Sequence, residues 1–224
     1  MSLEMINRVK KLSLTEEIAR ELRQSIVSGK LKPNTRLYEK ELAGQLGVSR
    51  GPLREALRLL EGEGIIISTT GRGSFVNSFS ERKVTELYSI RTILEQEAAR
   101  LAAKKAKPDQ IASLEQILQL MLQAARDGDL DNVINLDIQF HQRIWEIADH
   151  TSLLQILNGL SSQIRSYLAV QTSLYEDLAA GISDHNDILG CLMNGDGDAA
   201  AILIRQHLEH AASVVINFAH DQEQ

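Results

Sequence analysis

The stretch RLYEKELAGQLGVSRGPLREALRLL, residues 36–60, decides the fold of the first part of the chain. The spacing of its apolar residues predicts a short helix over 39–46 and a second helix over 50–63, separated by a tight turn at 47–49. We expect Ser49 to cap the second helix, because serine is among the preferred residues just before a helix begins. Two short helices joined by a three-residue turn that contains glycine are typical of a helix-turn-helix motif.

A β-hairpin is predicted directly after this motif. The apolar run 65–68 and the segment 74–76 enclose a glycine-rich turn over 69–73, which is the pattern of two short strands and a tight connection. Gly71 and Arg72 fall at the tip of the turn, where an arginine can reach the minor groove or a phosphate. A hairpin in this position is a wing, so the first part of the chain is predicted to be a winged helix-turn-helix.

The second helix of the motif carries a row of arginines. Arg50, Arg54 and Arg58 are spaced four residues apart and project from a different side than the apolar stripe. Arginine is suited to guanine in the major groove, and a helix N-terminus favours a nearby phosphate. The alternative is a solvent-facing surface with Arg/Glu pairs. The wing that follows favours the nucleic-acid interpretation.

The charge of the chain is unevenly distributed. Residues 1–80 contain 13 Lys and Arg against 9 Asp and Glu, a net charge of +4, whereas residues 81–224 contain 11 against 21, a net charge of −10. This asymmetry is typical of a polyanion-binding domain on an acidic body. The single cysteine, Cys191, and the lack of a stretch approaching ~18 apolar residues favour a cytoplasmic protein without a membrane span.

The second part of the chain has a helical pattern throughout. Short breaks divide it into about six helices, which an antiparallel bundle accommodates economically. The predicted fold class is therefore mostly α, with a winged helix-turn-helix domain over 1–78 and an all-α bundle over 79–224.

Four polar residues lie on apolar stripes of this predicted bundle. Asp137 and His141 are four residues apart on one helix, and His185 and His207 share apolar stripes of two later helices. Each histidine alone is compatible with a hydrogen-bonded core residue. A buried unpaired charge is costly, however, and one divalent metal ion would satisfy all four groups. The remaining histidines, His150, His210 and His220, are expected in solvent.

The first part of the sequence resembles the DNA-binding signature of the GntR family of bacterial regulators. The resemblance runs through RLYEKELA at 36–43 and LGVSRGPLREALRLL at 46–60. It implies DNA contacts from the two helices and the wing, by Lys40, Arg50, Arg54, Gly71 and Arg72. Ser49 and Arg58, on the same helix region, complete the set of residues that we expect at the DNA. Many members have arginine in place of Lys40, so a phosphate contact is expected there in preference to base readout.

The second part resembles the FCD ligand-binding domain of FadR-type GntR regulators. The matching segments are DIQFH at 137–141, DHNDIL at 184–189 and IRQHL at 204–208, and about six helices resembles the VanR-type subgroup. The resemblance implies that the metal ligands are Asp137, His141, His185 and His207. It also implies that Arg91 lines the effector cavity; the alternative is a plain ion pair with Glu95.

These observations predict a homodimeric transcriptional regulator that binds a pseudo-palindromic double-stranded DNA operator and responds to a small organic acid. The expected cofactor is a divalent metal, with zinc as the leading candidate and nickel, manganese and iron as alternatives. A metal-dependent hydrolase with a DNA-binding domain is the main alternative, but no additional inward carboxylate is evident as a general base, and four protein ligands crowd the metal. A protein-binding scaffold is a third possibility, although it would not need the arginine row. The chain is predicted not to be an enzyme.

Overall fold

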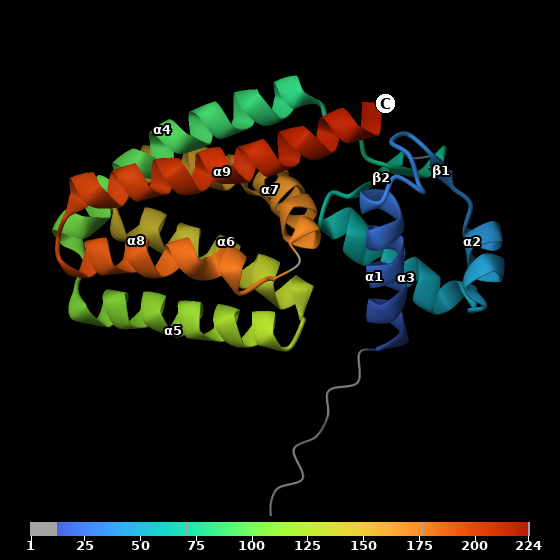
Figure 1. Cartoon of the computed structure of the whole chain (residues 1–224), viewed down its shortest axis with the longest axis horizontal. Helices are drawn as coiled ribbons and strands as arrows, with labels where there is room; N and C mark the ends of the chain where they lie inside the picture. The colour runs from blue at the N-terminus through green and yellow to red at the C-terminus, as the bar shows by residue number, and fades with distance from the viewer. Residues whose placement is uncertain (1–12, 70, 176, 224) are drawn as a thin grey trace, which may run out of the picture.

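The computed structural model describes residues 13–69, 71–175 and 177–223. Thr70 of the predicted wing turn and residues 1–12 of the predicted first domain lie outside the described residues. The described chain is mostly helical, as predicted, and forms a small N-terminal part, called the head here, beside a larger helical body (Figure 1). No described helix is both long enough and apolar enough to span a membrane.

The head is a winged helix-turn-helix. Its elements are α1 (Leu14–Val27), β1 (Arg36–Leu37), α2 (Glu39–Leu46), α3 (Arg50–Gly62), β2 (Ile66–Thr69) and β3 (Gly73–Val76). Gly47 ends α2 in the left-handed region, with φ 65°, which glycine adopts without steric cost. Ser49 occupies the N-cap position of α3 as predicted, with an extended backbone conformation. Its side chain makes no capping hydrogen bond.

The wing has one more strand than the sequence predicts. β2 and β3 form the expected antiparallel hairpin, and β1 adds to the outer side of β3, with Arg36 opposite Phe75. A two-residue strand is too short to produce an alternating pattern, so sequence periodicity could not reveal it. Because β1 immediately precedes α2, the wing is tied to the helix-turn-helix by backbone pairing.

Among the described residues the body forms six α-helices, in agreement with the prediction of about six. They are α4 (Glu81–Lys105), α5 (Pro108–Arg126), α6 (Leu130–Ile147), α7 (Thr151–Leu174), α8 (Ser183–Met193) and α9 (Gly197–Glu223), with a short 3-10 turn at Ala180–Ile182. Figure 1 shows α9 running alongside α4, with α6 and α8 between this pair and α5. The inward faces of these helices meet in one apolar core.

The head packs directly against the body. Ile134 and Ile138 of α6, with Leu168 and Ala169 of α7, belong to the same buried cluster as the apolar residues of the head. At Gly64, after α3, a Cβ atom would come within 1.7 Å of Ser166 Oγ on α7, and the backbone has φ +69°. A side chain at position 64 therefore meets both a steric clash and backbone strain.

Candidate metal centre and nucleic-acid interface

The four polar residues predicted to face inward come together in the body. Asp137 and His141 lie on α6, His185 on α8 and His207 on α9, and all four are buried. One potential ligand atom from each residue lies within 4.8 Å of those of the others. Helix periodicity places each residue on an inward face, and the packing of α6, α8 and α9 brings the four together.

Hydrogen bonds orient two of the imidazole rings toward the cluster. His141 Nδ1 lies 2.6 Å from Glu95 Oε2, and His185 Nδ1 lies 3.1 Å from the carbonyl oxygen of Ile182. Both partners are acceptors, so each Nδ1 carries the hydrogen and each Nε2 carries a lone pair. Neither buried Nε2 has a hydrogen-bond partner, and both face the Asp137 carboxylate. Asp137 Oδ2 lies 3.2 Å from His185 Nε2, and Asp137 Oδ1 lies 3.8 Å from His141 Nε2. A histidine that binds a metal through one ring nitrogen usually donates a hydrogen bond from the other nitrogen. His141 and His185 have this arrangement, so the residues fit a divalent cation.

The charges of the site also suit a cation. Burial opposes ionisation of Asp137, but His185, His141 and His207 lower its pKa below the usual range. Burial lowers the pKa of His207 to about 4, which leaves its ring neutral and able to coordinate at neutral pH. The donor set is therefore one carboxylate and three imidazoles, and it could hold a metal of the kind that accepts mixed nitrogen and oxygen ligation.

Glu95 is a site residue that the sequence analysis missed. It is buried, it bridges Arg91 and His141, and it contradicts the expectation that no additional carboxylate points inward. Burial raises its pKa, but Arg91 and His141 more than compensate and hold it at about 2. The sequence does not reveal the contact of Glu95 with His141, because the two residues are 46 positions apart. Within α4, the i,i+4 pair with Arg91 already accounts for an inward Glu95.

Arg91 is buried in the ion pair that the sequence left as its alternative role. Its Nε donates to Glu95 Oε1 at 2.5 Å, and its guanidinium lies 5.6 Å from the centre of the Tyr88 ring. The Tyr88 hydroxyl is buried without a hydrogen-bond partner. Arg91 and Tyr88 thus lie next to the residue that orients His141.

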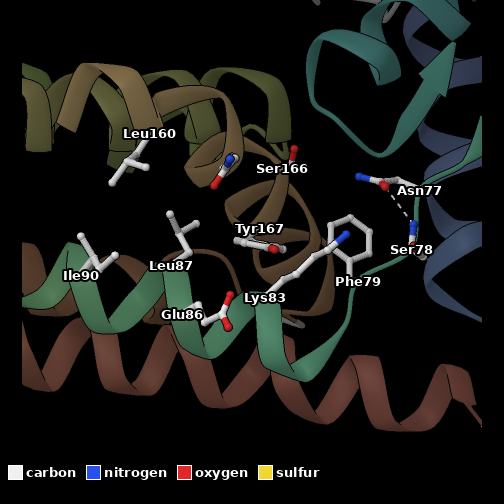
Figure 2. Close-up of a pocket in the computed structure, with 11 residues that line it drawn as sticks. Asn77, Ser78, Phe79, Lys83, Glu86, Leu87, Ile90, Leu160, Ser166 and Tyr167 are labelled. Carbon is white, nitrogen blue, oxygen red and sulfur yellow. Dashed lines mark hydrogen bonds between the residues drawn. The ribbon is translucent and has the colours of Figure 1, made fainter. Parts of the chain in front are cut away.

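A surface cavity of about 330 Å³ reaches the cluster. It is lined by Tyr175, Gly181, Asp184, His207 and His210. Asp184 Oδ2 lies 3.5 Å from His207 Nδ1 and is a further carboxylate that sequence reasoning did not single out. A second cavity of about 450 Å³ lies between α4 and α7 beside the 77–79 segment, and it shares no lining residue with the cluster (Figure 2).

The residues predicted to contact DNA are all exposed on the head. They are Lys40, Ser49, Arg50, Arg54, Arg58, Gly71 and Arg72. Arg54 Nε lies 2.7 Å from Glu39 Oε2 in a pair that solvent reaches, so the guanidinium can exchange this partner for DNA at little cost. Arg58 lines a cavity together with Asp131 and Arg165 of the body, which places it at the junction and apart from Arg50 and Arg54.

Comparison with known families identifies both parts of the chain. Residues 14–76 match the bacterial regulatory proteins of the gntR family, and residues 86–210 match the FCD domain. The chain belongs to the GntR family, with an FCD domain in its C-terminal part.

Relatives of this GntR regulator support the assignment. It is 32% identical to the transcriptional repressor RspR of Escherichia coli over 202 residues, 90% of this chain and 89% of that protein. It is 31% identical to the gluconate operon transcriptional repressor of Bacillus subtilis, over 78% of this chain and 74% of that protein. The structure of McbR from E. coli aligns with a TM-score of 0.62 and 25% identity, covering 96% of this chain and all of the other.

These matches decide between the functional classes left open by the sequence. The GntR regulator is a DNA-binding transcriptional regulator and not an enzyme, because the relatives are named as regulators and both domain families are regulatory. Glu95 does not supply the general base that the hydrolase alternative needs. Glu95 is inward, but its low pKa and its contacts with Arg91 and His141 leave it unsuited to accept a proton.

Replacing a cluster histidine should weaken metal binding and stability together. We expect His141→Ala and His207→Ala each to lower zinc content and to remove most of the stabilisation by added zinc, which is about 2.7 kcal/mol at a hundredfold excess over Kd. His210→Ala is the matched control, because His210 is exposed and lies three residues after the ligand position His207 on the same helix. Zinc analysis and thermal unfolding with and without chelator measure both effects. Equal losses in all three variants would contradict the assignment.

Proposed function

We propose that this regulator is a homodimer whose operator affinity is set by a small carboxylate bound at a divalent metal in the FCD domain. The observation that carries the proposal is the pair of buried Nε2 lone pairs on His141 and His185, each fixed by a hydrogen bond at Nδ1. We assign Asp137, His141, His185 and His207 as the metal ligands. A bound metal would supply Lewis acidity and hold α6, α8 and α9 together. Zinc is the first candidate, and nickel, manganese and iron accept the same donors.

The effector is proposed to bind beside Tyr88 and Arg91. The buried Tyr88 hydroxyl has no partner, and its pKa, raised to about 12 by burial, also responds to the charges of Arg91 and Asp137 and to Tyr175. A carboxylate there could accept hydrogen bonds from the hydroxyl and from the terminal nitrogens of Arg91, whose Nε is occupied by Glu95. The surface cavity lined by Tyr175 and His207 opens toward the same cluster, on its His207 side. One relative is named for a gluconate operon, and gluconate is a carboxylate of this class.

DNA is proposed to bind across the exposed side of α3 and the tip of the wing. Arg50 and Arg54 project from the N-terminal half of α3, the half that major-groove binding places at the base edges. We assign base contacts to these two residues, and backbone contacts to Lys40, Ser49, Gly71 and Arg72. Arg58 lies beside the body, so we assign it a phosphate contact at the edge of the interface.

The dimer is proposed to form through α4 and α7. Ile90 and Ile93 of α4 and Ile156 of α7 are exposed, and Figure 2 shows Ile90 facing Leu160 across the cavity between the two helices. Two charged side chains of opposite sign, Lys83 and Glu86, flank the same cavity on α4. About a two-fold axis, Lys83 of one copy can meet Glu86 of the other, which makes the surface complementary to itself. We therefore take the occupant to be a second copy of this chain.

Loss of Arg54 should weaken operator binding, and loss of its partner Glu39 should not. Arg54→Ala should cost about 1–3 kcal/mol on a cognate operator and relax preference at one base pair. Glu39→Gln frees the guanidinium and removes a negative charge near the phosphates, so affinity should stay equal or rise. Fluorescence anisotropy at several salt concentrations measures both variants. Normal operator binding by Arg54→Ala would exclude this face of α3.

Arg91→Lys tests effector recognition. The substitution keeps the positive charge but loses the planar fork, so the response to effector should fall well over tenfold while operator affinity without effector stays near normal. Operator affinity is measured with a panel of small hydroxy- and dicarboxylic acids, gluconate included. Tyr88→Phe should also weaken the response, without loss of zinc. If Arg91→Lys instead lowers zinc content and leaves the response intact, Arg91 only holds Glu95 against His141.

A charge placed on the proposed dimer surface should separate the subunits. Ile93→Lys introduces like charges near the two-fold axis, so we expect a monomer by light scattering and a large loss of affinity for a full palindrome. Ile202→Lys on α9 is the matched control, because Ile202 is also an exposed isoleucine in the body. A dimer that survives Ile93→Lys and dissociates with Ile202→Lys would move the interface to α9.

A further inference from the structure

A buried ion cluster joins the head to the body away from the metal site, and among the proposed DNA contacts only Arg58, at the edge of the interface, lines a cavity with its members. Arg23 of α1 donates to Glu63 from Nε at 3.1 Å and from Nη2 at 2.6 Å, and Nη2 also donates to Asp131 Oδ1 at 2.9 Å. Arg23 and Glu63 are buried, and Asp131 is partly buried. Asp131 lies 108 residues from Arg23 in the sequence, so the contact exists only in the assembled chain.

The cluster depends on the guanidinium. Burial raises the pKa of Glu63 to about 7, and the hydrogen bonds and charge of Arg23 limit the rise. Removing Arg23 would leave two carboxylates facing each other at the junction, one of them buried. Removing Asp131 is milder, because the two-point contact between Arg23 and Glu63 remains. The contact with the body can therefore be cut without destroying the head.

The body side of the cluster is the helix that carries half of the metal site. On α6, Asp131 and the buried Ile134 and Ile138 face the head, whereas Asp137 and His141 face the metal cluster. Asp131 and Asp137 are six residues apart, about 9 Å along a rigid helix. A shift or rotation of α6 at the metal cluster would therefore also move its contact with Arg23.

The head side of the cluster is the end of the DNA-contacting helix. Glu63 is the C-cap residue of α3, at the opposite end from Arg50. The thirteen residues of α3 span about 20 Å, so a small change of angle at Glu63 displaces the N-terminal end by a larger distance. An anchor at this end determines how the helix is presented to DNA.

We propose that Arg23 is a positioning residue for DNA binding: through Glu63 and Asp131 it fixes the orientation of α3 relative to α6. Through this joint the state of the metal-binding helix reaches the operator-binding surface. The positioning role stands on the contacts at the junction alone. The coupling to metal rests on the proposed function.

The test removes only the contact between Arg23 and Asp131 and leaves the contact between Arg23 and Glu63 in place. Asp131→Ala is compared with Asp109→Ala, because each aspartate is the second residue of its helix and each loses the same favourable interaction with the helix dipole. Operator affinity is measured at pH 8, where Glu63 is ionised, with zinc-loaded and chelator-treated protein. The distance between spin labels at Gln45→Cys and Gln119→Cys, in a Cys191→Ser background diluted with unlabelled protein, reports the position of the head.

We expect Asp131→Ala to retain zinc, to broaden the distance distribution and to reduce the ratio of zinc-loaded to zinc-free operator affinity at least threefold. Asp109→Ala should match the parent protein. An unchanged distance distribution together with parental operator affinity would overturn the positioning role, as would an effect that appears only because zinc is lost. If the parent protein binds its operator equally with and without zinc, metal regulation fails, and the distance distribution and zinc-free affinity decide the role of Arg23.

Discussion

The cost of burying polar groups among apolar helices is the constraint on which this structure depends. Asp137 and three imidazoles occupy positions in the bundle where aliphatic side chains would pack without penalty. Two of the imidazoles satisfy one nitrogen internally and keep the other free. Such a cluster lowers the stability of the bundle on its own, so its presence indicates that another interaction offsets the cost. In this regulator, a bound cation is the interaction that fits.

The charged groups around the cluster form a chain that extends beyond it. Arg91 holds Glu95, Glu95 holds His141, and His141 lies on the same helix as Asp131, which contacts the head. Except for the step along α6 from His141 to Asp131, each link is a short contact between groups that are wholly or partly withdrawn from water, where electrostatic interactions are stronger than at the surface. The fold thus places two ionic clusters on α6, one inside the FCD domain and one at the contact with the DNA-binding head, alongside the apolar junction formed by Ile134 and Leu168.

The sequence was informative wherever a single helix determined the answer. Asp137 and His141 stood out because polar residues four apart interrupt an apolar stripe, and the same reasoning found His185 and His207. It was uninformative where the answer depended on how helices pack. The contact of Glu95 with His141 and that of Arg23 with Asp131 join residues 46 and 108 positions apart, and no local pattern reports them. The position of Arg58 beside the body and the pairing of β1 with the wing have the same origin. Ser49 occupies the N-cap position of α3 but makes no capping hydrogen bond through its side chain. The residue type therefore indicates where the helix begins, and not whether the capping hydrogen bond forms.

The contact of Gly64 with Ser166 bears on how exchangeable the two domains are. Winged helix-turn-helix heads and FCD bodies are distinct families, and a designer would be inclined to recombine them freely. Here the head approaches α7 so closely that position 64 has no room for a side chain while Ser166 is present. A chimaera made with another head would need a glycine at that point or a smaller residue on α7. Recombination of these modules is thus limited by steric fit at the junction, independently of whether each module folds.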